Sequence, residues 1–167
     1  MKRKLLAATL ALTSLTATAG ITDFGDFSKA EPTLILGATS IHHDSWSREH
    51  LNQQHPSIGI EMWDISVTYV EKNSWNEASI YAAWTPEFYE SEYVDLSFAL
   101  GFATGYHADN KVIDEHGKTW KMDEKYANDL GVIPLIGISA KVNLTENVHM
   151  DVNVTPMVTM FNLGLDF

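Results

Sequence analysis

The 167-residue sequence contains no cysteine. This absence excludes a disulfide framework, thiolate metal sites and a thiol nucleophile. Basic residues are also scarce, because 11 Lys and Arg stand against 22 Asp and Glu. So acidic a chain gains nothing from a polyphosphate backbone, and we expect no nucleic-acid partner. Beyond residue 19 no apolar run approaches the roughly 20 residues of a spanning helix, so a place in a membrane would require a closed β-barrel.

The first 19 residues have the pattern of a secretory signal peptide. A basic start at residues 2–4 is followed by an apolar run over 5–15 and by the small residues Ala17-Thr18-Ala19. We therefore predict export, with cleavage after Ala19. Because the signal peptide removes three basic residues, the mature 148 residues carry 8 Lys and Arg against 22 Asp and Glu, a formal net charge of −14.

Large apolar residues in the rest of the chain recur at every second position. From Val94 to Ala103, large apolar side chains at even positions alternate with small or polar ones at odd positions, and 148–154 and 161–167 repeat the pattern. A period of two predicts strands, and no helix of useful length is indicated. The predicted strands span approximately 33–42, 57–63, 65–73, 78–86, 93–106, 132–142, 148–155 and 159–167.

These eight strands predict an all-β fold, an antiparallel up-and-down transmembrane β-barrel over 33–167, preceded by an N-terminal segment at 20–32. Long connections (43–56 and 107–131) and short ones (Asp64 and 143–147) fall on opposite rims, as the outer loops and periplasmic turns of outer-membrane barrels do. The terminal Phe167 also resembles that class. Aromatic residues near strand ends predict an interfacial girdle: Trp63, Tyr69, Trp75, Tyr81, Trp84 and Tyr106.

The interior of such a barrel should be polar and filled. Eight strands leave room for side chains only, so we expect a hydrogen-bonded core in which Lys141 and His149 are paired with acids. The inward acids are Glu61, Asp95, Asp151 and Asp166. The alternative is a soluble periplasmic barrel that binds an apolar ligand, which would turn Phe98, Leu100 and Phe161 inward.

The long-loop rim carries the candidate chemistry. Its histidines and acid have irregular spacing, so we expect solvated loop histidines, no metal site and no cofactor: His42, His43, Asp44, His50 and His55. Strands one and three both run outward from a periplasmic N-terminus, which places His42 and Ser74 on the same rim. A serine activated by a histidine can act as a nucleophile in acyl transfer.

At these positions the chain resembles the lipid A palmitoyltransferase family of outer-membrane barrels. The resemblance is carried by Ser74-Trp75-Asn76, by Leu96 to Thr104 and by Val132-Ile133-Pro134-Leu135. It implies an eight-stranded barrel that transfers a palmitoyl chain from a phospholipid to lipid A. It also implies a catalytic histidine at His42, with His43 as the rival, and a serine at Ser74. Asn73 replaces the family carboxylate, which implies slow or absent activity that Asn73→Asp should raise.

The chain is also similar to a group of phage and bacterial envelope barrels of unclear function. Ser40-Ile41-His42, the run from His55-Pro56 to Glu61, and Asn73-Ser74 follow the order of that group's motifs, and the similarity covers residues 33–167.

Two functions follow from the sequence, besides the soluble alternative. One is a non-enzymatic outer-membrane barrel, exposing long loops for surface modification or partner binding. The other is an acyltransferase acting on lipid A or phospholipid in the outer leaflet, with His42, Asn73 and Ser74 as its site. In both cases the expected partner is outer-membrane lipid, including acyl chains, and we expect a monomer.

Overall fold

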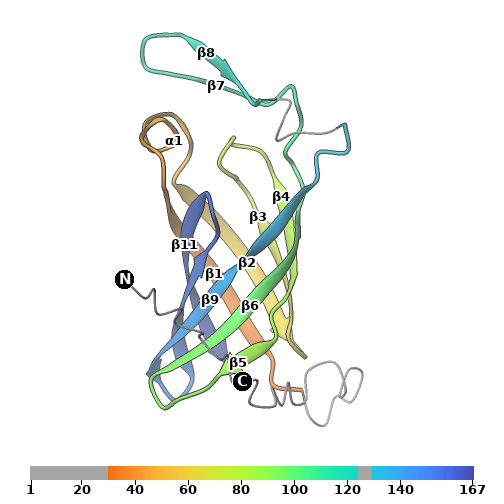
Figure 1. The fold of residues 1–167 in the computed structure, drawn as a ribbon, viewed down its shortest axis with the longest axis vertical. Helices are drawn as coiled ribbons and strands as arrows, with labels where there is room; N and C mark the ends of the chain where they lie inside the picture. Colours follow the sequence, from red (N-terminus) through yellow and green to blue (C-terminus); the bar gives the residue numbers. More distant parts are fainter. Residues whose placement is uncertain (1–29, 124–128) are drawn as a thin grey trace, which may run out of the picture.

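The computed structural model describes residues 30–123 and 129–167, which form a closed antiparallel β-barrel (Figure 1). Neighbouring strands in the sequence pair with each other, while β4 pairs with β6 and β1 with β11, so no edge remains open. The predicted signal peptide lies outside the described residues. The eight barrel strands are β1 (Thr33–His42), β2 (Gln54–Met62), β3 (Ile65–Val70), β4 (Ser79–Trp84), β6 (Val94–Ala103), β9 (Ile133–Thr145), β10 (Val148–Val154) and β11 (Val158–Asp166).

Four short elements supplement the barrel: α1 (Ser45–His50), β5 (Glu87–Tyr89), β7 (Lys111–Ile113) and β8 (Thr119–Lys121). The period-two analysis predicted neither α1 nor the β7–β8 hairpin. Asp44 caps α1, because its side chain accepts a hydrogen bond from Ser47 N at 2.8 Å. In the described part of the chain, no helix has the length and apolar character needed to cross a membrane.

The strands place large apolar side chains outside and small or polar ones inside. Phe98 and Leu100 are 44% and 42% exposed, whereas the intervening Ala99 lines an internal cavity. The same outward band includes Ile58, Val67 and Ile136. So extensive an apolar exterior is stable only in contact with lipid. The fold is therefore a transmembrane barrel, and the alternative of a soluble barrel with an apolar interior is wrong.

Long and short connections lie at opposite ends of the barrel, as predicted. α1, the turn after β3 and the β7–β8 hairpin extend from the upper end in Figure 1, which we call the outer end. At the lower, inner end β2 and β3 are joined by Trp63 and Asp64, whose φ angles of 55° and 58° are those of a two-residue hairpin turn. Thr33 pairs with Asp166, so the barrel begins and closes at this inner end.

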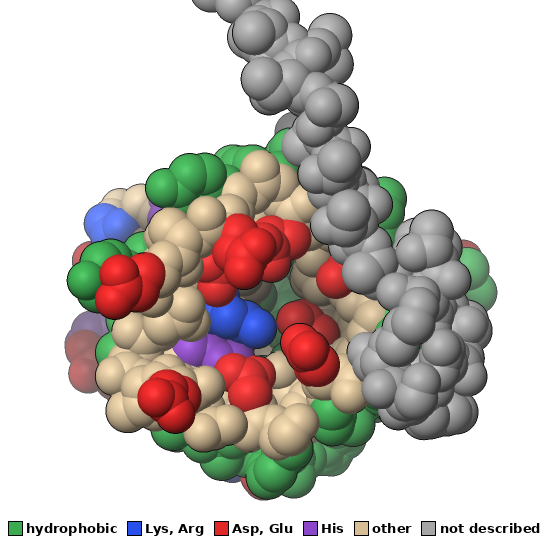
Figure 2. All heavy atoms as spheres, turned by 90° about the horizontal axis from the view of Figure 1, so that it is seen from below, with side chains coloured by type: hydrophobic (Ala, Val, Ile, Leu, Met, Phe, Trp, Pro, Cys, Tyr) green, Lys and Arg blue, Asp and Glu red, His purple; other side chains and the backbone are tan. Residues whose placement is uncertain are grey.

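Charged side chains occupy the inner end of the interior. His149 is 1% exposed, with Nδ1 3.0 Å from Asp166 Oδ2 and Nε2 3.4 Å from Asp151 Oδ1, which confirms its predicted pairing. Lys141 lies opposite Asp151 in register and forms no direct salt bridge with a described carboxylate, but its charge interacts with the buried carboxylate of Glu61, so its predicted pairing is electrostatic and not a direct contact. Figure 2 looks into this end and shows acidic side chains around an opening.

Candidate functional site

His42 and Ser74 meet at the outer end of the barrel. His42 is the last residue of β1 and points inward, and Ser74 lies in the turn that follows β3. The Nε2 atom of His42 is 3.0 Å from Ser74 Oγ, which is hydrogen-bond distance between a base and a hydroxyl. We call His42 and Ser74 the rim pair. The structure thus brings together the two side chains that strand counting placed on one rim.

Gln53 contacts the Nδ1 side of the His42 ring. Its amide Nε2 lies 2.8 Å from His42 Nδ1, 3.2 Å from Ser47 O and 3.1 Å from Leu51 O. Its Oε1 atom accepts from the backbone N–H of His42 at 3.3 Å and lies 3.1 Å from Nδ1. In the tautomer with the proton on Nδ1, Oε1 accepts that proton, and Nε2 carries the lone pair that accepts the hydrogen bond of Ser74. A general base requires this tautomer.

Asn73 does not contact His42, contrary to the role that the resemblance gave it. Its Oδ1 atom accepts from the backbone N–H of Trp75 at 2.8 Å and of Glu77 at 3.1 Å. Its Nδ2 group donates to Ser79 Oγ at 2.9 Å and to Gly105 O at 3.1 Å. All of the hydrogen-bonding capacity of its side chain is used by the turn after β3, by Ser79 at the start of β4 and by Gly105 after β6, and Gln53 occupies the orienting position instead.

The other rim histidines differ in their surroundings. His43 is exposed and bonds Pro156 O at 3.1 Å and Thr159 Oγ1 at 3.0 Å, so His42 and not His43 faces Ser74. His42 and His55 are only 5% and 7% exposed, so the expectation of solvated histidines is wrong for both. Among the residues that the structure describes, no three histidine or acidic side chains are grouped as metal ligands.

A second serine–histidine pair was not predicted. Ser40 Oγ lies 2.8 Å from His55 Nε2, and His55 Nδ1 donates to the backbone carbonyl of Lys72 at 2.9 Å. We call Ser40 and His55 the lumen pair. The sequence held part of the signal for this pair. Ser40 and His42 are two residues apart on a strand, so both point to the same, inward face.

An apolar cluster packs over the rim pair. Trp75 and Tyr106 belong to its buried centre, and Trp46 from α1 contacts Trp120 from β8 with ring centroids 5.4 Å apart. Burial raises the pKa of Tyr106, and its hydrogen bond with Ser74 opposes that rise. Trp75 and Tyr106 are therefore core residues, and the prediction that they form a lipid-facing girdle is wrong. Tyr69 and Trp84 are exposed, as a girdle requires.

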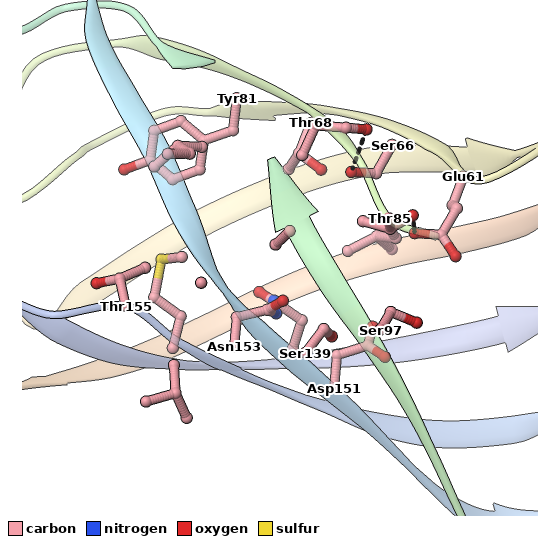
Figure 3. A pocket seen from close by; sticks show the side chains of 18 of the residues that line it. Glu61, Ser66, Thr68, Tyr81, Thr85, Ser97, Ser139, Asp151, Asn153 and Thr155 are labelled. Atoms are coloured by element: carbon pink, nitrogen blue, oxygen red, sulfur yellow. Dashed lines mark hydrogen bonds between the residues drawn. The ribbon is translucent and has the colours of Figure 1, made fainter. Parts of the chain in front are cut away.

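An internal cavity of about 110 Å³ runs through the barrel below the rim. His55 and Thr39 line it near the outer end, and Glu61, Lys141 and Asp151 line it near the inner end. Figure 3 shows that hydroxyl side chains from several strands make up much of its wall. The interior is therefore polar, and its free space is small.

Comparisons with known proteins show no family for this chain. No family model matches the chain, and no curated protein matches it. Among solved structures, the outer membrane protein Ail of Yersinia pestis, determined in a phospholipid bilayer nanodisc, aligns with a TM-score of 0.40. The two chains are 12% identical over 83% of this chain and 100% of Ail. The resemblance to the palmitoyltransferase family stays a prediction. The closed barrel and its apolar exterior make this protein an eight-stranded transmembrane β-barrel.

Proposed function

We propose that this protein is an outer-membrane enzyme that acts on acyl esters of outer-leaflet lipids. Ser74 would be the nucleophile, His42 the general base and Gln53 the residue that orients His42. The observation that carries the proposal is the 3.0 Å contact between Ser74 Oγ and His42 Nε2, together with the contacts of Gln53 at His42 Nδ1. The outer-membrane location is supported by the apolar exterior and by the predicted signal peptide.

The proposed reaction is an acyl transfer in which Ser74 carries the acyl group between two steps. Ser74 Oγ attacks the ester carbonyl carbon while its proton passes to His42 Nε2. The bond to the leaving alcohol breaks, and the alcohol takes that proton. Water or a second hydroxyl then removes the acyl group from Ser74 by the same steps. Gln53 is neutral. Burial disfavours the protonated form of His42, and the nearby carboxylate of Asp44 offsets part of this electrostatically.

The surroundings of the site indicate a lipid whose chains remain in the membrane. Ile41, next to His42, is 51% exposed on the outer face of β1, so the rim adjoins the lipid-facing surface. The internal cavity of about 110 Å³ is smaller than the roughly 150 Å³ cavity that holds benzene in an engineered protein. A palmitoyl chain does not fit that space. Only the ester group would therefore reach Ser74.

The test is lipid turnover by the purified barrel in vesicles of phosphatidylethanolamine and lipid A, followed by mass spectrometry. We expect lysophospholipid or lipid A with an altered acyl number. Ser74→Ala and His42→Gln should remove this product, and the neighbouring exposed change His43→Gln should retain it. Absence of any acyl change with folded native protein would contradict the proposal, as would full turnover by Ser74→Ala.

Partner binding through the outer loops is a second candidate. The β7–β8 hairpin stands beyond the barrel in Figure 1, and its Ile113 side chain is 66% exposed. An exposed apolar side chain on a projecting hairpin suits contact with another surface molecule. Replacing residues 111–121 with a short Gly-Ser turn should then abolish a surface phenotype, such as altered phage adsorption, that Ser74→Ala retains. Retention of the phenotype by the hairpin replacement would exclude this function.

A further inference from the structure

The lumen pair has the geometry of an activated serine and is separate from the rim pair. The backbone carbonyl of Lys72 can only accept, so the proton of His55 lies on Nδ1. Nε2 then accepts from Ser40 Oγ at 2.8 Å. The Ser40 hydroxyl makes no other hydrogen bond with a described residue, so its own lone pairs remain available. Nucleophile, base and orienting group are all in place.

His55 of the lumen pair also adjoins space that a substrate can occupy. It lines the internal cavity, which extends to Glu61 and Asp151 near the inner end, and Ser40, which is 2% exposed, lies against its Nε2 atom. The opening at that end is surrounded by acidic side chains (Figure 2), so anionic molecules are repelled there. The cavity of about 110 Å³ is smaller than the roughly 150 Å³ cavity that holds benzene in an engineered protein, so only small molecules fit it. Size and charge together select small acyl compounds that are neutral or cationic.

We propose that Ser40 and His55 form a second acyl-transfer site, which adjoins the barrel interior through His55 and takes small neutral or cationic esters. Ser40 Oγ attacks the carbonyl carbon, and its proton moves to His55 Nε2. The leaving alcohol departs with that proton, and water later hydrolyses the acyl-serine in the same manner. The site does not depend on Ser74 and therefore does not rest on the lipid activity of the rim pair.

A purely structural role makes a different prediction. Pro56 has no backbone N–H, and the β1–β2 register shifts between Gly37 and Thr39, so the ladder is interrupted beside the pair. Hydrogen bonds from Ser40 through His55 to Lys72 would then serve only to join β1, β2 and β3. In that case the thermal midpoint would depend on the pair, but the hydroxyl of Ser40 would have no unusual reactivity.

The test is sulfonylation of the full mature barrel in detergent by methanesulfonyl fluoride, a neutral reagent smaller than benzene. The Ser40 oxygen displaces fluoride from sulfur, and His55 takes the proton. Peptide mapping by mass spectrometry should locate the label on Ser40, and His55→Gln should slow labelling by about 10²-fold or more. Ser139, which lines the same cavity without a histidine partner, should remain unlabelled, and Ser139→Ala should react at the native rate.

Two results would overturn the proposal. One is a native, folded barrel whose Ser40 stays unlabelled, and the other is labelling of Ser40 at the native rate in His55→Gln. Because the label is mapped in the native protein, the result stands even if Ser40→Ala fails to fold. Loss of lipid turnover in Ser74→Ala is measured separately, so failure of either site is recognised independently.

Discussion

Buried histidines have different partners at the two ends of the barrel. At the outer end, the rim pair and the lumen pair each join a neutral imidazole to a serine hydroxyl. At the inner end, His149 lies between the carboxylates of Asp151 and Asp166. A neutral imidazole that accepts from a hydroxyl can take its proton, whereas a histidine held by two acids is engaged in an ion pair. The outer histidines can therefore act as bases, whereas His149 stabilises the barrel.

The largest expected effect is a difference in lipid turnover between variants at the outer end and at the inner end of the barrel. Gln53→Ala removes both amide contacts at His42 Nδ1, so the ring loses the partner that orients it and the Nδ1-protonated form loses its acceptor. Lipid turnover should fall by about 10²–10⁴-fold, since a misdirected base loses its contribution. At the inner end, His149→Gln should leave turnover per folded molecule unchanged. Equal losses in the two variants, measured by mass spectrometry of the products, would break the distinction between the ends.

The free energy of unfolding should depend more on the inner His149 than on the outer His42. His149→Ala leaves two inward carboxylates without their shared partner, and we expect a loss of about 3–5 kcal/mol in unfolding free energy. The measurement is urea unfolding in detergent micelles. His42→Ala removes only neutral hydrogen bonds and should cost less. A His149→Ala barrel as stable as the native one would show that the inner pairing contributes little.

A charged substitution in the lipid-facing apolar band should destabilise the barrel as a whole. Leu100→Arg places a cation on the outer face of β6 and should cost about 2–4 kcal/mol near the bilayer midplane. Ala99→Ser points into the polar cavity and should be nearly neutral. Folding titrations in vesicles compare the two variants. Similar stability of both would contradict the assignment of the outer face.

The turn after β3, which carries Ser74, should be sensitive to substitution of Asn73. Asn73→Asp turns two donated hydrogen bonds into contacts between a buried carboxylate and the oxygens of Ser79 and Gly105. We expect a loss of about 1–3 kcal/mol and no gain in turnover. The resemblance to the palmitoyltransferase family implied the opposite, a gain in activity. Higher turnover in Asn73→Asp would restore the catalytic role of that position.

The smallest effect concerns α1 and its cap. Asp44→Ala should cost about 1 kcal/mol, the usual value for an N-cap. The backbone N–H of Ser47 holds the pKa of Asp44 below its usual value. The cap is therefore intact above the ordinary carboxyl pKa and is lost as the pH falls through the lowered value, below about pH 4. Near-ultraviolet circular dichroism of the tryptophan cluster should change in that range, and in Asp44→Ala it should not.

Strand positions and the rim pair could be predicted from sequence because both follow from simple periodicities. Period two placed the strands, and their direction brought His42 to the level of Ser74. Gln53 escaped prediction because its role depends on a loop conformation that presents Ser47 O and Leu51 O to its amide. Lys141 interacts with Glu61 through its charge but forms no direct salt bridge with Asp151, because opposition in register does not ensure contact. Trp75 and Tyr106 looked like girdle residues, since sequence does not tell which way loop aromatics turn.

The most direct test of the account is the acyl composition of lipid A and phospholipids from cells that carry the native protein, Ser74→Ala or an empty vector. Mass spectrometry should show an altered acyl pattern with the native protein alone, while Ser74→Ala, present at equal amounts in the outer membrane, matches the empty vector. Identical patterns in all three, with the native barrel folded and inserted, would contradict the assignment of the rim pair as an acyl-ester site.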